Sequence, residues 1–135
     1  MIRALPEPTE LTLPYWEAAR AGSLHLQRCE SCRRFVHFPE ISCPFCGGGD
    51  LAWTAAPDRG TVHTFSVIHR TFAPGFADLV PYVIAWVELD GHPEARLFGN
   101  VSGCAPDQVS IGMAVDVIFE DLEEFGPIPN FRASH

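Results

Sequence analysis

The 135-residue sequence contains no lysine, so all nine of its basic residues are arginines. This absence excludes Schiff-base chemistry on a lysine amine and the phosphate-binding lysine of a P-loop. Positive charge is also scarce, because 17 acidic residues leave a formal net charge of −8 at pH 7. A chain of this charge repels a phosphate backbone unless its arginines gather on one face. We therefore expect no nucleic-acid partner.

Long apolar runs are missing as well. No stretch approaches the roughly 18 consecutive apolar residues of a membrane span. Residues 1–10 also show no apolar run behind a basic start, which a secretory signal would require. We therefore expect no membrane partner and a cytoplasmic location.

Recognisable catalytic motifs are absent too. The sequence contains neither a GxSxG nor an HExxH motif. His63 and His69 are six residues apart on one expected strand and hence on one face, but without a third ligand they are weak evidence for a site. Asp121, Glu123 and Glu124 are explained by a solvated acidic turn. We expect that the chain is not itself an enzyme.

Four of the five cysteines form two matched pairs. Cys29 and Cys32 are separated by two residues, and so are Cys43 and Cys46. This spacing lets both sulfurs of a tight turn face one point, and residues 33–42 suffice for a hairpin that returns the second pair. Four thiolates then surround a zinc ion at about 2.3 Å and leave no position for water. We interpret the four as ligands of a structural zinc.

Other uses of these cysteines remain open. CxxC also occurs in thiol redox proteins, and cysteines can form disulfides, but the doubled motif favours a metal site. Iron fits the same cage, although zinc is preferred. Unoxidised, metal-bound cysteines also fit the cytoplasm better than a secreted disulfide framework does. The fifth cysteine, Cys104, lies in an apolar stretch and is predicted to be a buried, inert thiol.

Periodicity and turn signals predict a mainly β protein with two domains, residues 1–56 and 57–135. The first is expected to contain a helix and the metal ribbon. The second is expected to be a small closed five-stranded barrel of the OB type, although periodicity alone does not exclude a sandwich. The last strand is expected at an edge. The predicted strands span residues 24–28, 51–55, 61–70, 82–89, 95–101, 114–120 and 128–132.

The predicted N-terminal helix lies within residues 12–22. Thr12 is its expected N-cap, and Gly22 its expected end. A helix of three turns is marginal alone, so its aromatic face has to pack on this chain or on a partner. We predict Tyr15 and Trp16 as partner-binding residues.

Several segments, in this order along the chain, carry a family resemblance. They are Pro14–Ala18, Gly22–Cys29, the CxxC and CPxCG pairs, Gly60–Phe65, Pro81–Leu89, Ile111–Val115 and the closing Pro129–Arg132. This succession resembles the DUF35 family over nearly the whole chain. The resemblance implies an N-terminal helix, a rubredoxin-like zinc ribbon and a C-terminal OB-fold. It also implies an acyl-CoA-associated accessory subunit of thiolase-like enzymes, which include lipid-transfer-type thiolases and aldolases of steroid side-chain breakdown.

A binder of coenzyme A needs cationic donors beside an aromatic or apolar channel. The segment 69–82 offers Arg70 beside Phe72 and Phe76 on a loop bent by proline and glycine. We predict these three as cofactor-binding residues, and the loop, ribbon and helix as a platform for a thiolase-like subunit. Alternatively, the phenylalanines simply fill one barrel end.

Two other functions remain as alternatives. OB barrels and zinc ribbons also bind single-stranded nucleic acid, and Phe65, Phe72 and Trp86 are aromatic residues that can stack on bases. The acidic charge argues against this function. The second alternative is a purely structural subunit that contacts no ligand. The identity of the acyl group and the reaction of the partner do not follow from the sequence.

Overall fold

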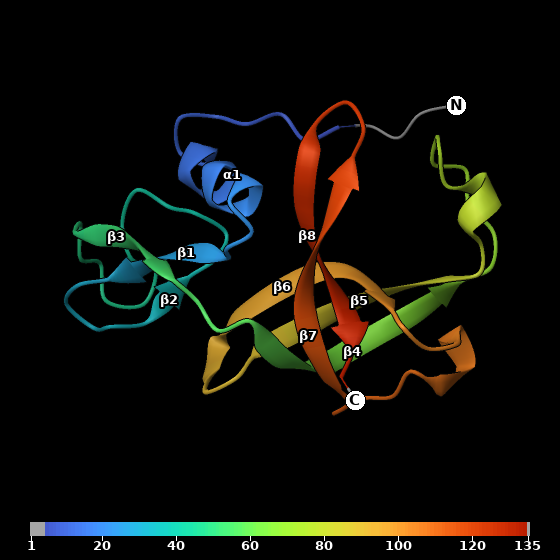
Figure 1. Cartoon of the computed structure of the whole chain (residues 1–135). Helices are drawn as coiled ribbons and strands as arrows, with labels where there is room; N and C mark the ends of the chain where they lie inside the picture. Colours follow the sequence, from blue (N-terminus) through green and yellow to red (C-terminus); the bar gives the residue numbers. More distant parts are fainter. Residues whose placement is uncertain (1–4, 135) are drawn as a thin grey trace.

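The computed structural model describes residues 5–134, which form one α-helix, eight strands and two short 3-10 helices (Figure 1). The helix α1 spans Leu13–Arg20. The strands are β1 His25–Cys29, β2 Phe35–Val36, β3 Leu51–Ala55, β4 Arg59–Ile68, β5 Tyr82–Leu89, β6 His92–Ser102, β7 Ala114–Leu122 and β8 Gly126–Ala133. The 3-10 helices are η1 Ala77–Leu79 and η2 Pro106–Gln108. No helix within this range is long and apolar enough to cross a bilayer.

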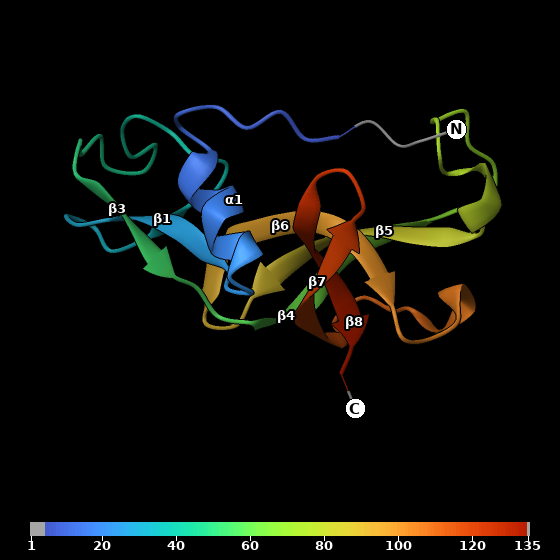
Figure 2. The same cartoon turned by 45° about the horizontal axis from the view of Figure 1, so that its top comes forward.

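The strands form two sheets. The first is a three-stranded antiparallel sheet in the order β2-β1-β3, which carries both cysteine turns at one end. The second is a closed barrel in the order β4-β5-β6-β8-β7. Both views show α1 between the small sheet and the β7–β8 hairpin (Figures 1 and 2). The predicted mainly β fold, with one N-terminal helix, a ribbon and a five-stranded barrel, is confirmed.

One hydrophobic core joins the two sheets. Along β5 every second side chain is buried, so that this face of the strand lines the barrel interior. Phe35 of the ribbon belongs to the same buried cluster as Val87 of β5. A hydrogen bond supports this contact, since the Phe35 N–H donates to Glu94 Oε2 in β6 over 3.1 Å. The ribbon therefore packs on the barrel as part of its core.

The position of β8 differs from the prediction. β8 is not an edge strand, because it lies between β6 and β7 and closes the barrel. It pairs with β7 over its whole length but is parallel to β6 only at Phe131 and Arg132. Pro127 and Pro129 lack an N–H, and β8 keeps its pairing with β7, so the missing donors face away from β7. β8 therefore cannot continue its ladder with β6 at these positions.

The start of α1 also differs from the prediction. Thr12 stands at the N-cap position, but its side chain caps no helical N–H. Its backbone (φ −95°, ψ −11°) is helical instead of extended, and its Oγ1 accepts the Thr9 N–H over 2.9 Å. Of the two predicted partner-binding residues, Tyr15 packs on the barrel core, and Ala19 of the same helix is buried. Gly22 (φ +77°) follows the helix in the left-handed conformation, as expected for its end.

The two histidines that were expected to share a strand face do not do so. β4 ends at Ile68, which leaves His69 in the following loop. A register shift between Val62 and Thr64 also interrupts the alternation at His63. The His63 Nδ1 lies 3.2 Å from Glu88 Oε1 on the barrel surface. The expected common face therefore does not exist.

Candidate metal centre and the aromatic groove

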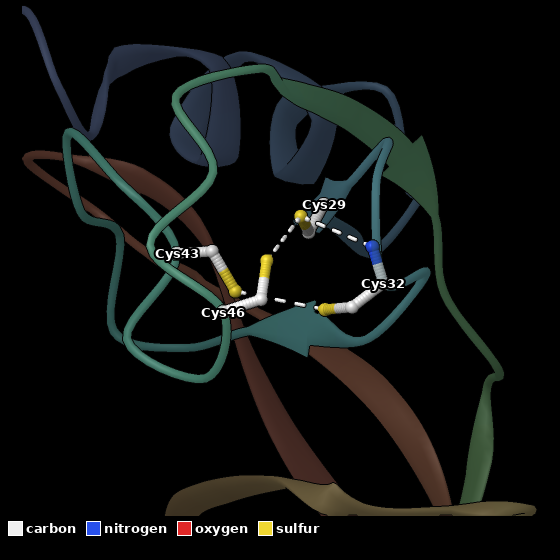
Figure 3. Close-up of side chains that lie close together, drawn as sticks. All are labelled: Cys29, Cys32, Cys43 and Cys46. Atoms are coloured by element: carbon white, nitrogen blue, oxygen red, sulfur yellow. Dashed lines mark hydrogen bonds between the residues drawn. The ribbon is translucent and has the colours of Figure 1, made fainter.

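The side chains of Cys29, Cys32, Cys43 and Cys46 converge on one point (Figure 3). Their Sγ atoms all lie within 4.8 Å of one another. The Sγ atoms of Cys29 and Cys46 are 3.6 Å apart, and those of Cys32 and Cys43 are 3.7 Å apart. A tetrahedron with metal–sulfur bonds of about 2.3 Å has edges of about 3.8 Å. The four cysteines are thus positioned for a metal ion.

The two cysteine turns have the same backbone construction. The Arg33 N–H donates to the Cys29 carbonyl over 2.9 Å, and the Gly47 N–H donates to the Cys43 carbonyl over 2.8 Å. Arg33 (φ +65°) and Gly47 (φ +77°) are both left-handed. Each turn therefore reverses at the fourth residue after its first cysteine. Glycine adopts this conformation without strain, whereas arginine does so at a cost.

Backbone N–H groups point at the sulfurs. The Cys32 N–H lies 3.5 Å from Cys29 Sγ, and the Phe45 N–H lies 3.4 Å from Cys43 Sγ. A Cβ at Gly48 would lie 3.4 Å from the sulfurs of Cys29 and Cys46, so a glycine here lets the chain pass close to the site. These donors stabilise thiolates, which are the form that binds a metal.

The thiol pKa values show the effect of crowding four sulfurs. The backbone N–H of Cys32 lowers the pKa of Cys29 to about 6 despite its burial. The pKa of Cys46 is raised to about 11, because the Gly48 N–H, which lowers it, is outweighed by the neighbouring sulfurs and by burial. Several adjacent thiolates repel one another unless a cation neutralises them. A divalent metal ion therefore fits this donor set.

Cys104 lies outside the metal cluster. It is half-buried and packs against the barrel core, so it is less enclosed than predicted.

An apolar groove lies beside the ribbon, where β8 fails to pair with β6. Its larger part has a volume of about 560 Å³ and is walled by α1, β5, β6, β8, the N-terminal segment and the loop before β5. A smaller part of about 190 Å³ lies between α1, β6 and the ribbon. Tyr15, Trp16 and Phe98 line both parts. We call the two parts together the aromatic groove.

The structure brings together some of the predicted binding residues. Tyr15, Trp16 and Phe76 line the larger part of the groove, and the Phe76 ring packs on Tyr82 at 5.5 Å. Phe72 is 95% exposed and does not fill the barrel end. Arg70 is exposed and does not line the groove. The roles of all these residues in binding a cofactor or a partner stay predictions.

The groove residues that the sequence reasoning missed include His37, Phe38 and Phe98. His37 and Phe38 lie between the two cysteine pairs, where an aromatic pair was a usable signal. Phe98 is 50% exposed on the outer face of β6.

The proposed base-stacking residues are dispersed. Phe65 packs against the barrel core, and the Trp86 ring contacts Phe98 at 5.2 Å. Of the three, Phe72 alone is fully exposed. No specific observation favours a nucleic-acid site.

His37 is buried among aromatic rings. Its ring lies 5.9 Å from Tyr15 and 4.6 Å from Phe38. Burial lowers the pKa of His37 from 6.5 to about 4, so the imidazole is neutral at pH 7. Its Nδ1 has no hydrogen-bond partner among the described residues.

Replacing His37 with phenylalanine is expected to reduce the acid sensitivity of the fold. The unfolded chain takes up a proton on His37 below pH 6.5, whereas the folded chain resists doing so down to about pH 4. Stability therefore falls as the pH falls through this window, by about 2–3 kcal/mol at pH 4.5. Urea unfolding at pH 7 and pH 4.5 measures the loss in both proteins. Equal losses in the wild type and His37→Phe would contradict this account.

Models of two ChsH2 domains match consecutive parts of the chain. The rubredoxin-like zinc ribbon domain matches residues 16–52, and the C-terminal OB-fold domain matches residues 53–120. A "DUF35 domain-containing scaffold protein" of Methanothermobacter thermautotrophicus is 37% identical over 101 residues, which is 73% of each chain. The chain belongs to the DUF35 family. The predicted domain boundary of this DUF35 chain, after residue 56, stays a prediction.

Two further relatives of this DUF35 protein are informative. The solved structure named "Ltp2-ChsH2(DUF35) aldolase" matches with a TM-score of 0.84 and 34% identity, and the match covers 96% of this chain and 98% of that one. A "Probable enoyl-CoA hydratase alpha subunit" of Thermomonospora curvata is 36% identical over 118 residues. The aligned part is 87% of this chain but only 36% of that relative.

Proposed function

We propose that this DUF35 chain is a non-catalytic accessory subunit that docks a thiolase-like enzyme of the lipid-transfer or aldolase type and assists its handling of an acyl-CoA substrate. The observation that carries the proposal is the match, over 96% of the chain, to a DUF35 structure whose name includes Ltp2 and an aldolase. At 34% identity the match supports a related role as well as a related fold.

The described part of the chain supports an accessory role in its own chemistry. Four thiols positioned for one metal leave no open coordination site for catalysis. The aromatic groove is lined by uncharged side chains. Burial raises the pKa of Tyr15 to about 12 and lowers the pKa of His37 to about 4, so neither of these neighbouring groups is poised for proton transfer near neutral pH. A binding surface beside a metal-stabilised ribbon is what remains.

The acyl-CoA part of the proposal rests on the name of a relative and on two exposed loop residues. The Thermomonospora curvata relative is named as a subunit of an enoyl-CoA hydratase. Arg70 and Phe72 are exposed on the loop before β5 and do not line the groove, so a guanidinium and a ring can meet a phosphate and an adenine outside it. We place the reaction in steroid or fatty-acid metabolism, in the cytoplasm.

The metal is proposed to be zinc with a structural role. A zinc-loaded protein is colourless and releases about one zinc per chain on denaturation. Elemental analysis together with the visible spectrum of protein from its native cells distinguishes zinc from iron. A red preparation with one iron per chain would show that the ion is iron and not zinc, and the structural role of the site would be unchanged.

The function is tested by purifying the tagged protein from its native cells and identifying its companion by mass. We expect a thiolase-like subunit in fixed ratio to the tagged chain. A polymerase or helicase component in that position would refute the proposal, and so would a chain that has no companion.

The acyl-CoA part is tested in the purified complex, where acyl-CoA is expected to shift the amide resonances of residues 70–76. If these resonances stay unchanged, the chain docks the subunit but takes no part in acyl-CoA handling.

A further inference from the structure

We infer that the aromatic groove receives an apolar segment of the thiolase-like subunit that is flanked by arginine or lysine residues. This inference rests on the proposed function and goes beyond it, since it specifies which face of this chain docks and what chemistry the partner segment has. Three features of the structure support it: connected aromatic rings, a lining without charge and an unpaired acidic rim.

The rings around the groove form a connected series. Trp16 contacts both Phe125 at 5.1 Å and Tyr15 at 4.8 Å. From Tyr15 the series continues through His37, Phe38, Trp86 and Phe98, with centroid separations from 4.6 to 6.4 Å. These rings come from α1, the ribbon, β5, β6 and the β7–β8 turn (Figure 1). Aromatic side chains of this kind dominate the energetics of protein interfaces.

Part of this surface is accessible in the chain alone. Phe38 is 62% exposed and Phe98 is 50% exposed, and both line the smaller part of the groove. Large apolar side chains that are exposed together lower their free energy when a partner covers them. His37 also lines the smaller part of the groove, with its ring 4.6 Å from that of Phe38.

The groove itself is lined by no charged side chain, whereas several of the segments that supply its lining are rich in acidic residues, which we call the acidic rim. Both parts are lined only by apolar, aromatic, amide, hydroxyl and imidazole side chains. Four of the segments that supply residues to the larger part, residues 5–12, 13–20, 69–81 and 118–130, include two arginines and eight acidic residues. The eight are Glu7, Glu10, Glu17, Asp78, Glu120, Asp121, Glu123 and Glu124.

These eight carboxylates are not neutralised within residues 5–134. The ion pairs of the described chain involve Glu30, Glu88, Glu94 and Asp116, which are none of the eight. Seven of the eight are exposed, and Glu120 is half-buried. An uncharged groove inside an unpaired acidic rim favours an occupant that is apolar in the centre and cationic at its ends. The same rim repels the phosphates of coenzyme A, which argues against the cofactor as the occupant.

The test uses the complex of this chain with the thiolase-like subunit recovered from native cells, reconstituted from the purified components. Phe98→Asp and Phe38→Asp each place a carboxylate in the groove at an exposed position, and each is expected to weaken binding about 30-fold or more. Ile111→Asp is the matched control, because Ile111 is 70% exposed and lines neither part of the groove. Melting temperature and metal content establish that the variants are folded.

The acidic rim is tested separately by charge reversal. Glu123→Lys is expected to slow association about 3- to 10-fold at low salt and to reduce its salt dependence. Asp107→Lys, on η2, is the control with the same charge change. Hydrogen exchange of the complex is expected to show new protection in residues 13–17, 36–39 and 96–100.

The outcomes separate this inference from the proposed function. A complex that forms normally with Phe98→Asp and Phe38→Asp, or whose new protection lies elsewhere, overturns the inference and leaves the accessory function standing. In the isolated chain, hydrogen-exchange protection of the groove could instead grow with protein concentration, and sedimentation could show a dimer. This result would assign the groove to a second copy of the chain and would also overturn the inference. Failure of the wild-type chain to form any complex refutes both.

Discussion

Cys43→Ser is expected to abolish metal binding and to unfold the ribbon. Structural zinc sites contribute about 10–16 kcal/mol in small metal-binding peptides, so the loss of one buried ligand removes the main stabilisation of these turns. Cys43 is buried, and its sulfur lies 3.7 Å from that of Cys32. The damage is expected to reach the barrel, because Phe35 of the ribbon belongs to the barrel core.

The effect is measured by metal content per chain and by thermal unfolding followed by circular dichroism. Cys104→Ser is the matched control, since Cys104 is half-buried and lies outside the cluster of four sulfurs. It is expected to keep one metal per chain and to lose at most about 1–2 kcal/mol. A Cys43→Ser protein with the metal content and melting temperature of the wild type would show that the four sulfurs do not hold the ion.

Phe131→Ala is expected to destabilise the barrel by about 3–5 kcal/mol, the range for truncation of a buried phenylalanine. Phe131 is 1% exposed, and it is one of the two residues through which β8 pairs with β6. The variant therefore leaves a cavity at the point where the barrel closes. A loss of this size is a large part of the 5–15 kcal/mol that stabilises an ordinary domain.

Phe72→Ala is the matched control, because the same truncation is made at a side chain that is 95% exposed. Its free energy of unfolding is expected to stay within about 0.5 kcal/mol of the wild type. Urea unfolding of the metal-loaded proteins measures both. Equal small effects at the two positions would contradict the closure of the barrel through β8.

The cluster of four cysteines was predictable because its information is local. The spacing of Cys29–Cys32 and Cys43–Cys46 is enough to build two equal turns, and the structure brings the four sulfurs together. The barrel was predictable from strand composition and from the family resemblance. The predicted strand limits are mostly within two residues of those observed, as with residues 82–89 and β5.

The errors arose where distant residues decide the outcome. The edge position predicted for β8 was wrong, because a strand order depends on pairing that the local pattern does not contain. Thr12 has an N-cap residue type, but Thr9 competes for its hydroxyl. The common face predicted for His63 and His69 failed because β4 ends before His69.

The aromatic groove was predicted only in part. Tyr15 and Trp16 were chosen because the helix needed a surface to pack on, and Phe76 because it lies on a long loop. His37, Phe38 and Phe98 come from other segments, and the approach of these segments is set by the shared core. A groove that forms where two prolines prevent strand pairing has no signature in any single stretch of sequence.

The central claim is that a metal-stabilised ribbon holds this chain in the shape that docks a thiolase-like subunit. Native mass spectrometry tests it most directly, by mixing the purified subunit with zinc-loaded and with chelator-treated chain. The account predicts a complex that retains one metal per DUF35 chain in the first mixture and free components in the second. A complex of equal abundance and stoichiometry from the metal-free chain would contradict it.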